Sequence, residues 1–385
     1  MNIKILLFVI MAVLIYKVNA QDIGKTILQE NPFSFEAFYV GDLCYNFKGG
    51  IKRGSAFLGM GNLKLGFDTR KARLWKGGQI FINGATTHGD SPSGNLVGDF
   101  QVISNLDAGD HIYLHELWFK QSFGPVELTL GLQDLNVEFL VCEQGVHFLN
   151  SSFGVPPVVS SNIPAPIFPL TAIGITFKCG ISKNATWLGA VYDGCQTAYK
   201  HNVYNTNWHL KPEDGLLLIS EMHYSPLIFK KQAKYKAGIY YHTGLKQADE
   251  ISGELQVVFK DNKGLYCIID QDLWIHPDSI KKLGVFVQFA ASPRQNINNY
   301  YIGGGLTFSG LFLRDRNDVL CLGIAHAGFN GLIEKHETTV ELSYRYNVNE
   351  NIYVKPDVQY VMNPMGTGED LDDALVGILR FGLNF

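Results

Sequence analysis

The sequence has no long apolar run beyond its first twenty residues. A membrane-spanning helix needs about 20 consecutive apolar residues, so the rest of the chain is not built from such helices. The composition is weighted instead towards residues typical of turns and strands, with 40 glycines, 25 phenylalanines and 18 tyrosines. It therefore predicts an all-β protein.

Motifs for catalysis, metal binding and nucleic-acid binding are absent as well. There is no Gly-x-Ser-x-Gly or His-Glu-x-x-His run and the acidic residues are dispersed, so we expect no enzyme activity and no cofactor. The formal net charge of −4 argues against a nucleic-acid partner. The cysteines stand singly without a C-x-x-C spacing, which predicts free thiols and no metal site: Cys44, Cys142, Cys179, Cys195, Cys267 and Cys321.

Residues 1–20 have the composition of a cleavable secretory signal. Lys4 precedes an apolar run from Ile5 to Tyr16, and the small residue Ala20 ends the segment. The run is too short to span a bilayer as a helix, although retention as an anchor is the alternative. We therefore predict a signal peptide at 1–20, a periplasmic N-terminal segment at 21–34 and a β-barrel domain at 35–385.

Apolar and polar residues alternate throughout the rest of the chain, which is the period of a β-strand. In the last segment Leu375 and Leu379 point one way, whereas Val376 and Arg380 point the other. In a soluble sandwich the apolar face packs inward, whereas in a membrane barrel it faces lipid and the polar face lines a lumen. The period alone is compatible with both.

Two features favour the membrane barrel. The final strand ends on Phe385, the aromatic form of terminus that outer-membrane barrels present to their insertion machinery. Aromatic residues such as Trp118 and Tyr240 also gather near strand ends, as in interfacial girdles. We therefore expect a multi-pass protein of the bacterial outer membrane, surrounded by its lipid.

The lengths of the connections supply a third argument. The sequence has seventeen alternating segments, but a barrel with both termini in the periplasm needs an even number of strands. If the segment near residue 252 belongs to a long outer loop at 244–263, sixteen strands remain. Short connections then face the periplasm and long ones the outside. Sixteen strands leave an aqueous channel, which predicts permeation. The seventeen alternating segments begin near residues 35, 56, 79, 111, 126, 171, 185, 216, 235, 252, 264, 284, 301, 319, 338, 352 and 374.

The third long connection, residues 134–170, carries four prolines and apolar residues such as Phe148 and Phe153. This apolar content is too high for a loop in solvent, and a loop of this length is typically functional. We predict that it folds into the lumen as the constriction loop. The alternative is a loop packed across the barrel mouth for stability only.

Five runs of the sequence resemble the OprB family of carbohydrate-selective porins. The resemblance covers nearly the whole mature chain, although this sequence is poor in arginine for a member. It implies a sixteen-stranded outer-membrane barrel that passes glucose-like monosaccharides by passive diffusion through a polar constriction containing arginine. The runs are residues 87–99 (THGDSPSGNLVGD), 131–139 (GLQDLNVEF), 148–154 (FLNSSFG), 164–169 (PAPIFP) and 356–364 (PDVQYVMNP).

A sugar-selective passage needs hydrogen-bonding groups that replace water around hydroxyls, and aromatic faces for the sugar ring. Candidates lie after the first hairpin, at the base of the long loop and on the polar faces of the last strands. The alternative for each is a solvated lumen wall distant from the narrowing. We predict these pore-lining or substrate-contacting residues: Arg53, Glu116, Trp118, Asp134, Asn136, Glu138, Glu341, Arg345, Lys355, Asp357 and Arg380.

Two other functions stay open at this stage. One is a general or ion-type diffusion pore within the same barrel class. The other is an exported, soluble all-β carbohydrate-binding protein or hydrolase. A homo-oligomer of barrels is also compatible with the sequence, because lipid-facing and partner-facing surfaces are both apolar.

Overall fold

A computed structural model describes residues 31–228, 231–251, 254–277, 281–294, 296–312, 318–331 and 335–385. The expected signal peptide at 1–20 and most of the expected segment at 21–34 lie outside these residues. The regular secondary structure of the described chain is almost entirely strand, as the composition predicts. None of its helices has the length and apolar character that crossing a membrane requires.

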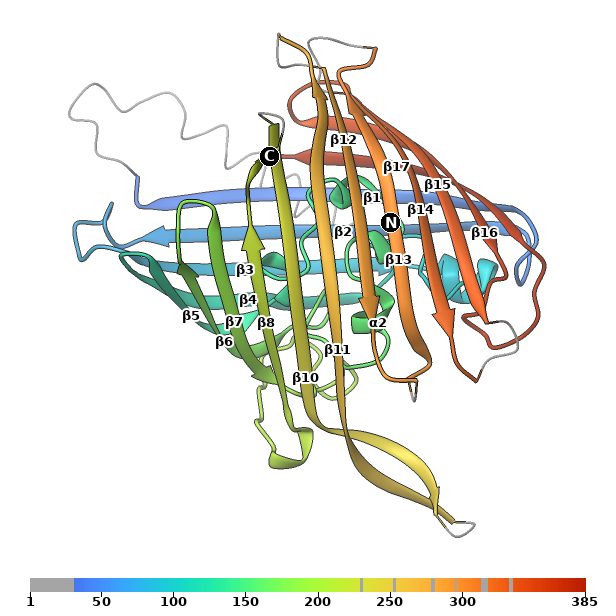
Figure 1. Ribbon diagram of the computed structural model, residues 1–385, viewed down its shortest axis with the longest axis horizontal. Helices are drawn as coiled ribbons and strands as arrows, with labels where there is room; N and C mark the ends of the chain where they lie inside the picture. Colours follow the sequence, from blue (N-terminus) through green and yellow to red (C-terminus); the bar gives the residue numbers. More distant parts are fainter. Residues whose placement is uncertain are drawn as a thin grey trace.

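Antiparallel pairing closes the strands into a barrel (Figure 1). β1 pairs with both β2 and β17, and the ring of sixteen long strands is complete without the two-residue β9, which pairs with β10. The predicted number of barrel strands is therefore confirmed, and the first strand begins two residues before the expected position. The bounds are β1 (Phe33–Lys48), β2 (Gly54–Asp68), β3 (Gly78–Gly89), β4 (His111–Phe123), β5 (Val126–Gln133), β6 (Ala172–Gly180), β7 (Ala185–Asp193), β8 (Leu216–Tyr224), β9 (Leu227–Ile228), β10 (Lys231–Ile251), β11 (Glu254–Ile275), β12 (Lys282–Ala291), β13 (Asn298–Ser309), β14 (Val319–Phe329), β15 (His336–Asn347), β16 (Ile352–Met362) and β17 (Ala374–Asn384).

Side chains alternate between the two faces of this sheet in the predicted phase. On β17 the outward Leu379 is 44% exposed, whereas the neighbouring Ile378 is 3% exposed. Leu43 on β1 and Leu342 on β15 are likewise exposed on the outer surface. The barrel thus presents an apolar outer face, and many of its inward side chains are covered by other parts of the chain.

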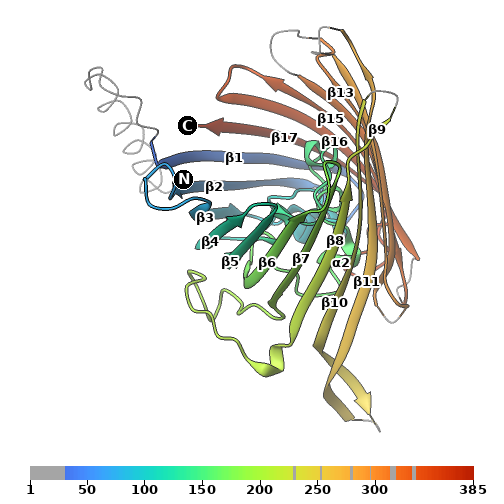
Figure 2. The same cartoon turned by 60° about the vertical axis from the view of Figure 1, so that its left-hand side comes forward.

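β10 and β11 are 21 and 22 residues long and extend together beyond the rim of the barrel (Figure 2). The expected long loop at 244–263 is therefore wrong. After a register shift between His242 and Leu245, pairing continues to Ile251 and Glu254. An antiparallel pair can keep exchanging backbone hydrogen bonds outside the ring, which explains why alternation persists near residue 252.

Two long connections fold back against the inner wall: the β5–β6 connection (residues 134–171) and the β3–β4 connection (residues 90–110). From the first, Phe148 packs on Phe153 and Phe286 with ring centroids 4.5 and 5.3 Å apart. Glycine is required beneath this ring, because a Cβ atom on Gly323 would lie 2.5 Å from Phe148. The second connection packs on β1, β2, β16 and β17 through an apolar cluster of its own. The core of the molecule therefore lies inside the barrel.

A buried ion pair joins β1 and β17, the first and last strands of the ring. Asp42 and Arg380 are direct register partners. The Nε and Nη2 atoms of Arg380 donate to the two carboxylate oxygens of Asp42 at 2.7 and 2.8 Å. Because this pair is bidentate and shielded from water, losing one partner leaves an uncompensated buried charge.

Replacing Asp42 by Asn should therefore destabilise the folded barrel by about 3–5 kcal/mol. The measurement is the urea dependence of unfolding in detergent micelles. Glu36→Gln is the matched control, because Glu36 on the same strand makes only an exposed ion pair with Lys64 at 3.3 Å. Equal unfolding midpoints for the Asp42 and Glu36 variants would contradict the importance of the buried pair.

Candidate functional site

Buried carboxylates on the inner wall hold the β5–β6 connection in place. Each accepts backbone N–H groups that the folded-in segment cannot pair within itself, at 2.8 to 3.1 Å. Charge-assisted bonds of this kind are the strong ones. The acceptors are Glu221 on β8 for Leu140, Asp270 on β11 for Glu143 and Gln144, and Glu341 on β15 for Leu149 and Asn150.

A fourth wall carboxylate, Glu337 on β15, holds the β3–β4 connection. It accepts the backbone N–H groups of Phe100 at 2.7 Å and Gln101 at 2.9 Å. It also accepts that of Met365, in the connection between β16 and β17. Asp99, the residue before Phe100, is itself buried, and burial raises the pKa of its carboxyl to about 6.

The wall formed by β1 to β4 carries a row of polar side chains that we call the β1–β4 strip. Lys64 contacts Glu36 at 3.3 Å, and the amide of Asn62 donates to Asn83 at 2.9 Å. Asn83 in turn donates to Glu116 at 3.2 Å. The strip also contains Phe81 and Trp118, whose rings stack with centroids 4.9 Å apart, and the Trp118 indole donates to Glu116 at 3.2 Å.

Lysine and glutamate side chains connect this strip to the base of the β5–β6 connection. The ammonium group of Lys120 lies 5.3 Å from the Trp118 ring and 3.4 Å from the Glu138 carboxylate. Lys178 on β6 reaches the other oxygen of Glu138 at 3.0 Å. Burial alone would raise the pKa of Glu138, but the two ammonium groups outweigh it and lower that pKa. Glu138 is therefore an anion at neutral pH.

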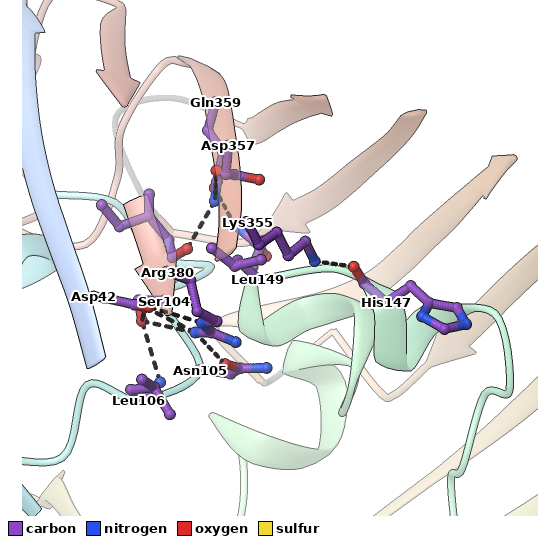
Figure 3. Close-up of polar contacts among 12 residues, drawn as sticks. Asp42, Ser104, Asn105, Leu106, His147, Leu149, Lys355, Asp357, Gln359 and Arg380 are labelled. Carbon is purple, nitrogen blue, oxygen red and sulfur yellow. Dashed lines mark hydrogen bonds and ion pairs between the residues drawn. The ribbon is translucent and has the colours of Figure 1, made fainter. Parts of the chain in front are cut away.

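A second polar group lies on β15 to β17 and faces the same interior (Figure 3). Arg380 is bound to Asp42 and also donates to Asn105 at 2.8 Å. The Lys355 ammonium group donates to the backbone carbonyl of His147 in the β5–β6 connection. Arg345 lies with its guanidinium 3.9 Å from the centroid of the Tyr353 ring. β1, β2 and β3 separate this group from the Trp118 side of the barrel.

The structure thus distributes the predicted site residues over three regions and one isolated position. Glu116, Trp118 and Glu138 meet near the β1–β4 strip, and Arg345, Lys355, Asp357, Glu341 and Arg380 lie on the last strands. Arg53 is exposed in the connection after β1, apart from both. Asp134 and Asn136 hold the loop base: the Asp134 carboxylate accepts the Asn136 backbone N–H at 2.8 Å and lies 3.2 Å from His115.

Sequence reasoning missed several residues that take part in these networks. The inward phase of each strand is the signal that could identify them. No group of three His, Cys, Asp or Glu residues in the described ranges could hold a metal ion. The missed residues are Glu36, Asp42, Asn62, Lys64, Phe81, Asn83, Lys120, Lys178, Glu221, Asp270 and Glu337.

Comparison with known proteins identifies the family. The family described as carbohydrate-selective porin, OprB family, matches residues 52–385. The chain belongs to this family. The OprB-family chain is 24% identical to Porin B of Pseudomonas aeruginosa, over 92% of this chain and 88% of that protein. It is 22% identical to the putative porin QuiX of Acinetobacter baylyi, over 93% and 90% of the two chains.

A solved structure shows the same fold. The high-pH structure of Pseudomonas putida OprB superposes with a TM-score of 0.82 at 20% identity, covering 92% of this chain and 94% of that one. The protein is therefore an outer-membrane β-barrel channel of the carbohydrate-selective kind, and the expected fold, family and location are confirmed.

Replacing Glu341 by Gln should loosen the β5–β6 connection. The neutral amide has one acceptor oxygen in place of two charged ones, so the N–H groups of Leu149 and Asn150 lose about 1.5–3 kcal/mol of hydrogen bonding. Hydrogen exchange at these two amides should accelerate, and single-channel conductance should rise. Glu127→Gln is the control, since it removes the same charge from a partly exposed lumen position. Unchanged exchange in Glu341→Gln would contradict the anchoring role.

Docking of the β3–β4 connection should weaken as the pH rises. The Asp99 carboxyl has a pKa of about 6 in the folded protein and about 3.9 in an unfolded chain. Its stabilising contribution is therefore fully present below about pH 3.9 and is lost as the pH rises to about 6. Ionised Asp99 is then a buried charge beside the side chain of Glu337. The Phe100 and Gln101 amides should lose protection from hydrogen exchange between these pH values. The Asp99→Asn variant is neutral at every pH and should keep this protection. If the protection is still lost in Asp99→Asn, Asp99 is not the titrating group.

Proposed function

We propose that this porin passes glucose-like monosaccharides by passive diffusion, between the β1–β4 strip and the β5–β6 connection. The stacked rings of Phe81 and Trp118 beside the Glu116 carboxylate carry the proposal. An aromatic face suits the C–H side of a sugar ring, and an adjacent carboxylate accepts hydrogen bonds from its hydroxyls. On this proposal Glu116, Trp118 and Glu138 contact the permeating sugar.

The balance of charge along this path supports a neutral solute. Lys64 is paired with Glu36, and Lys120 and Lys178 are both paired with Glu138. A ring of charges of one sign would select ions, and here the two signs alternate. The side chains of Lys64, Lys120 and Glu138 remain 27%, 19% and 26% exposed, so water and solutes can reach them inside the barrel.

On the same proposal the protein carries out no reaction, and its other partners are those of a barrel in a membrane. The exposed apolar outer face suits outer-membrane lipid or a second barrel in a homo-oligomer. Phe385 is 51% exposed, and its backbone N–H donates to Ala37 at 2.8 Å. Its ring is therefore available to the machinery that inserts outer-membrane barrels.

Proteoliposomes carrying the protein should swell faster in glucose than in a disaccharide or a size-matched amino acid. Trp118→Ala should reduce the preference for glucose by about threefold to tenfold, because the ring loses its stacking partner. Trp187→Ala is the matched control, since that indole is 39% exposed on the other face of the sheet and bonds to Ser220. Swelling rates that follow solute size alone in the wild type would identify a general diffusion pore instead.

A further inference from the structure

A small cavity of about 50 Å³ lies against the inner wall of β14 to β17, beneath the part of the β5–β6 connection that contains His147. We call it the basic niche. Its polar lining is provided by His147, Arg345, Tyr353, Lys355 and Arg380. Val146, which also lines it, is 63% exposed, so the niche opens towards water inside the barrel.

Three cations line the niche: Arg345, Lys355 and Arg380. Among the residues that the structure describes, only Arg380 is bound to a carboxylate. Arg380 is neutralised by its two bonds to Asp42. Lys355 donates to the His147 carbonyl, and the Nε of Arg345 donates to the amide oxygen of Asn347 at 3.0 Å, so both of these cations contact neutral acceptors. Within the described ranges, neither Arg345 nor Lys355 lies within 4.0 Å of a carboxylate oxygen.

The carboxylates elsewhere on this wall are already engaged. Glu341 accepts the Leu149 and Asn150 amides at 2.8 and 2.9 Å, and Asp357 accepts the Gln359 amide at 3.1 Å. Burial, together with the charges of Lys355, Arg345 and Lys282, lowers the pKa of His147 to about 4, so the histidine adds no charge at neutral pH. Glu341 and Asp357 act electrostatically on Lys355. Arg345 is therefore the cation of the niche whose charge is left without a carboxylate beside it in the described part of the chain.

The size and geometry of the niche restrict what can neutralise it. A single water needs roughly 10–15 Å³ of such space, so the cavity has room for a small group such as a carboxylate. The free N–H groups of a guanidinium stacked on an aromatic ring form a planar fork that matches a carboxylate. The rest of such a ligand would remain in the lumen, where the wall offers hydrogen-bonding groups to hydroxyls.

We propose that the basic niche binds the carboxylate of a sugar acid, such as an aldonate or uronate, while its hydroxyl-bearing chain lies in the passage used by neutral sugars. This inference rests on the proposed function, since it places a second substrate class beside the same lumen. Arg345 is the residue that distinguishes the two classes, because it has no anionic partner within the described chain and is not part of the β1–β4 strip.

The test uses the full-length protein in proteoliposomes at low salt, where chloride competes least. Uptake of labelled glucose is measured against increasing gluconate, unlabelled glucose or acetate. Gluconate should inhibit at a concentration about tenfold lower than unlabelled glucose. Arg345→Gln should abolish this advantage while changing inhibition by unlabelled glucose less than about twofold. Arg345→Lys keeps the positive charge but lacks the planar pair of N–H groups, so this variant should retain only part of the gluconate advantage.

Arg53→Gln is the matched control, because it makes the same substitution at an exposed arginine outside the niche and should keep the full gluconate advantage. Heat-dependent mobility on gels verifies that each variant is a folded barrel. Acetate as effective as gluconate, or an unchanged gluconate advantage in Arg345→Gln, would overturn the niche. Glucose uptake that follows solute size alone would count against the proposed function, whereas selective glucose uptake without a gluconate advantage would count against the niche alone.

Discussion

The interior of this porin depends on wall carboxylates that bind backbone N–H groups of the connections. A closed sheet satisfies its own backbone hydrogen bonds, so it has none left for a segment folded inside it. Glu221, Asp270, Glu337 and Glu341 supply the missing acceptors. The apolar side chains of the same segments, Phe148 and Phe153 among them, can pack on the wall only because these backbone groups are satisfied.

This anchoring divides the inner wall into two parts with different roles. From β8 to β16 much of the wall is covered by the β5–β6 connection, and Glu221, Asp270 and Glu341 on this part bind that connection. Along β1 to β4, polar and aromatic side chains such as Lys64 and Trp118 keep contact with solvent. Substitutions along β1 to β4 can therefore change selectivity without releasing the β5–β6 connection. Substitutions from β8 to β16 change how that connection is held, and with it the shape of the lumen.

Much of the barrel could be predicted from the sequence, because a period of two places each side chain on one face regardless of distant contacts. The phase of Leu379 and Arg380, the strand count and the inward loop all follow from local pattern and loop length. The roles of inward residues could not be predicted in the same way. Glu341 has the phase of a pore residue but is fully buried beneath Leu149, and only the position of a segment almost two hundred residues away determines this.

The same limit explains the error at residues 244–263. Alternation near residue 252 indicates a strand, whereas the need for an even number of barrel strands favours a loop. A paired ribbon satisfies both conditions, since it lengthens two existing strands and adds none to the ring. Charge pairing across strands, as in Lys64 and Glu36 or Asp42 and Arg380, likewise depends on register, which alternation does not specify.

The ribbon formed by the outer parts of β10 and β11 also has a practical consequence. Its pairs beyond the register shift at His242 and Leu245 belong to no other strand of the ring. A foreign peptide inserted between Ile251 and Glu254 would therefore lengthen a hairpin that projects from the barrel without disturbing the closure of the sheet. That position is a natural choice for an epitope tag.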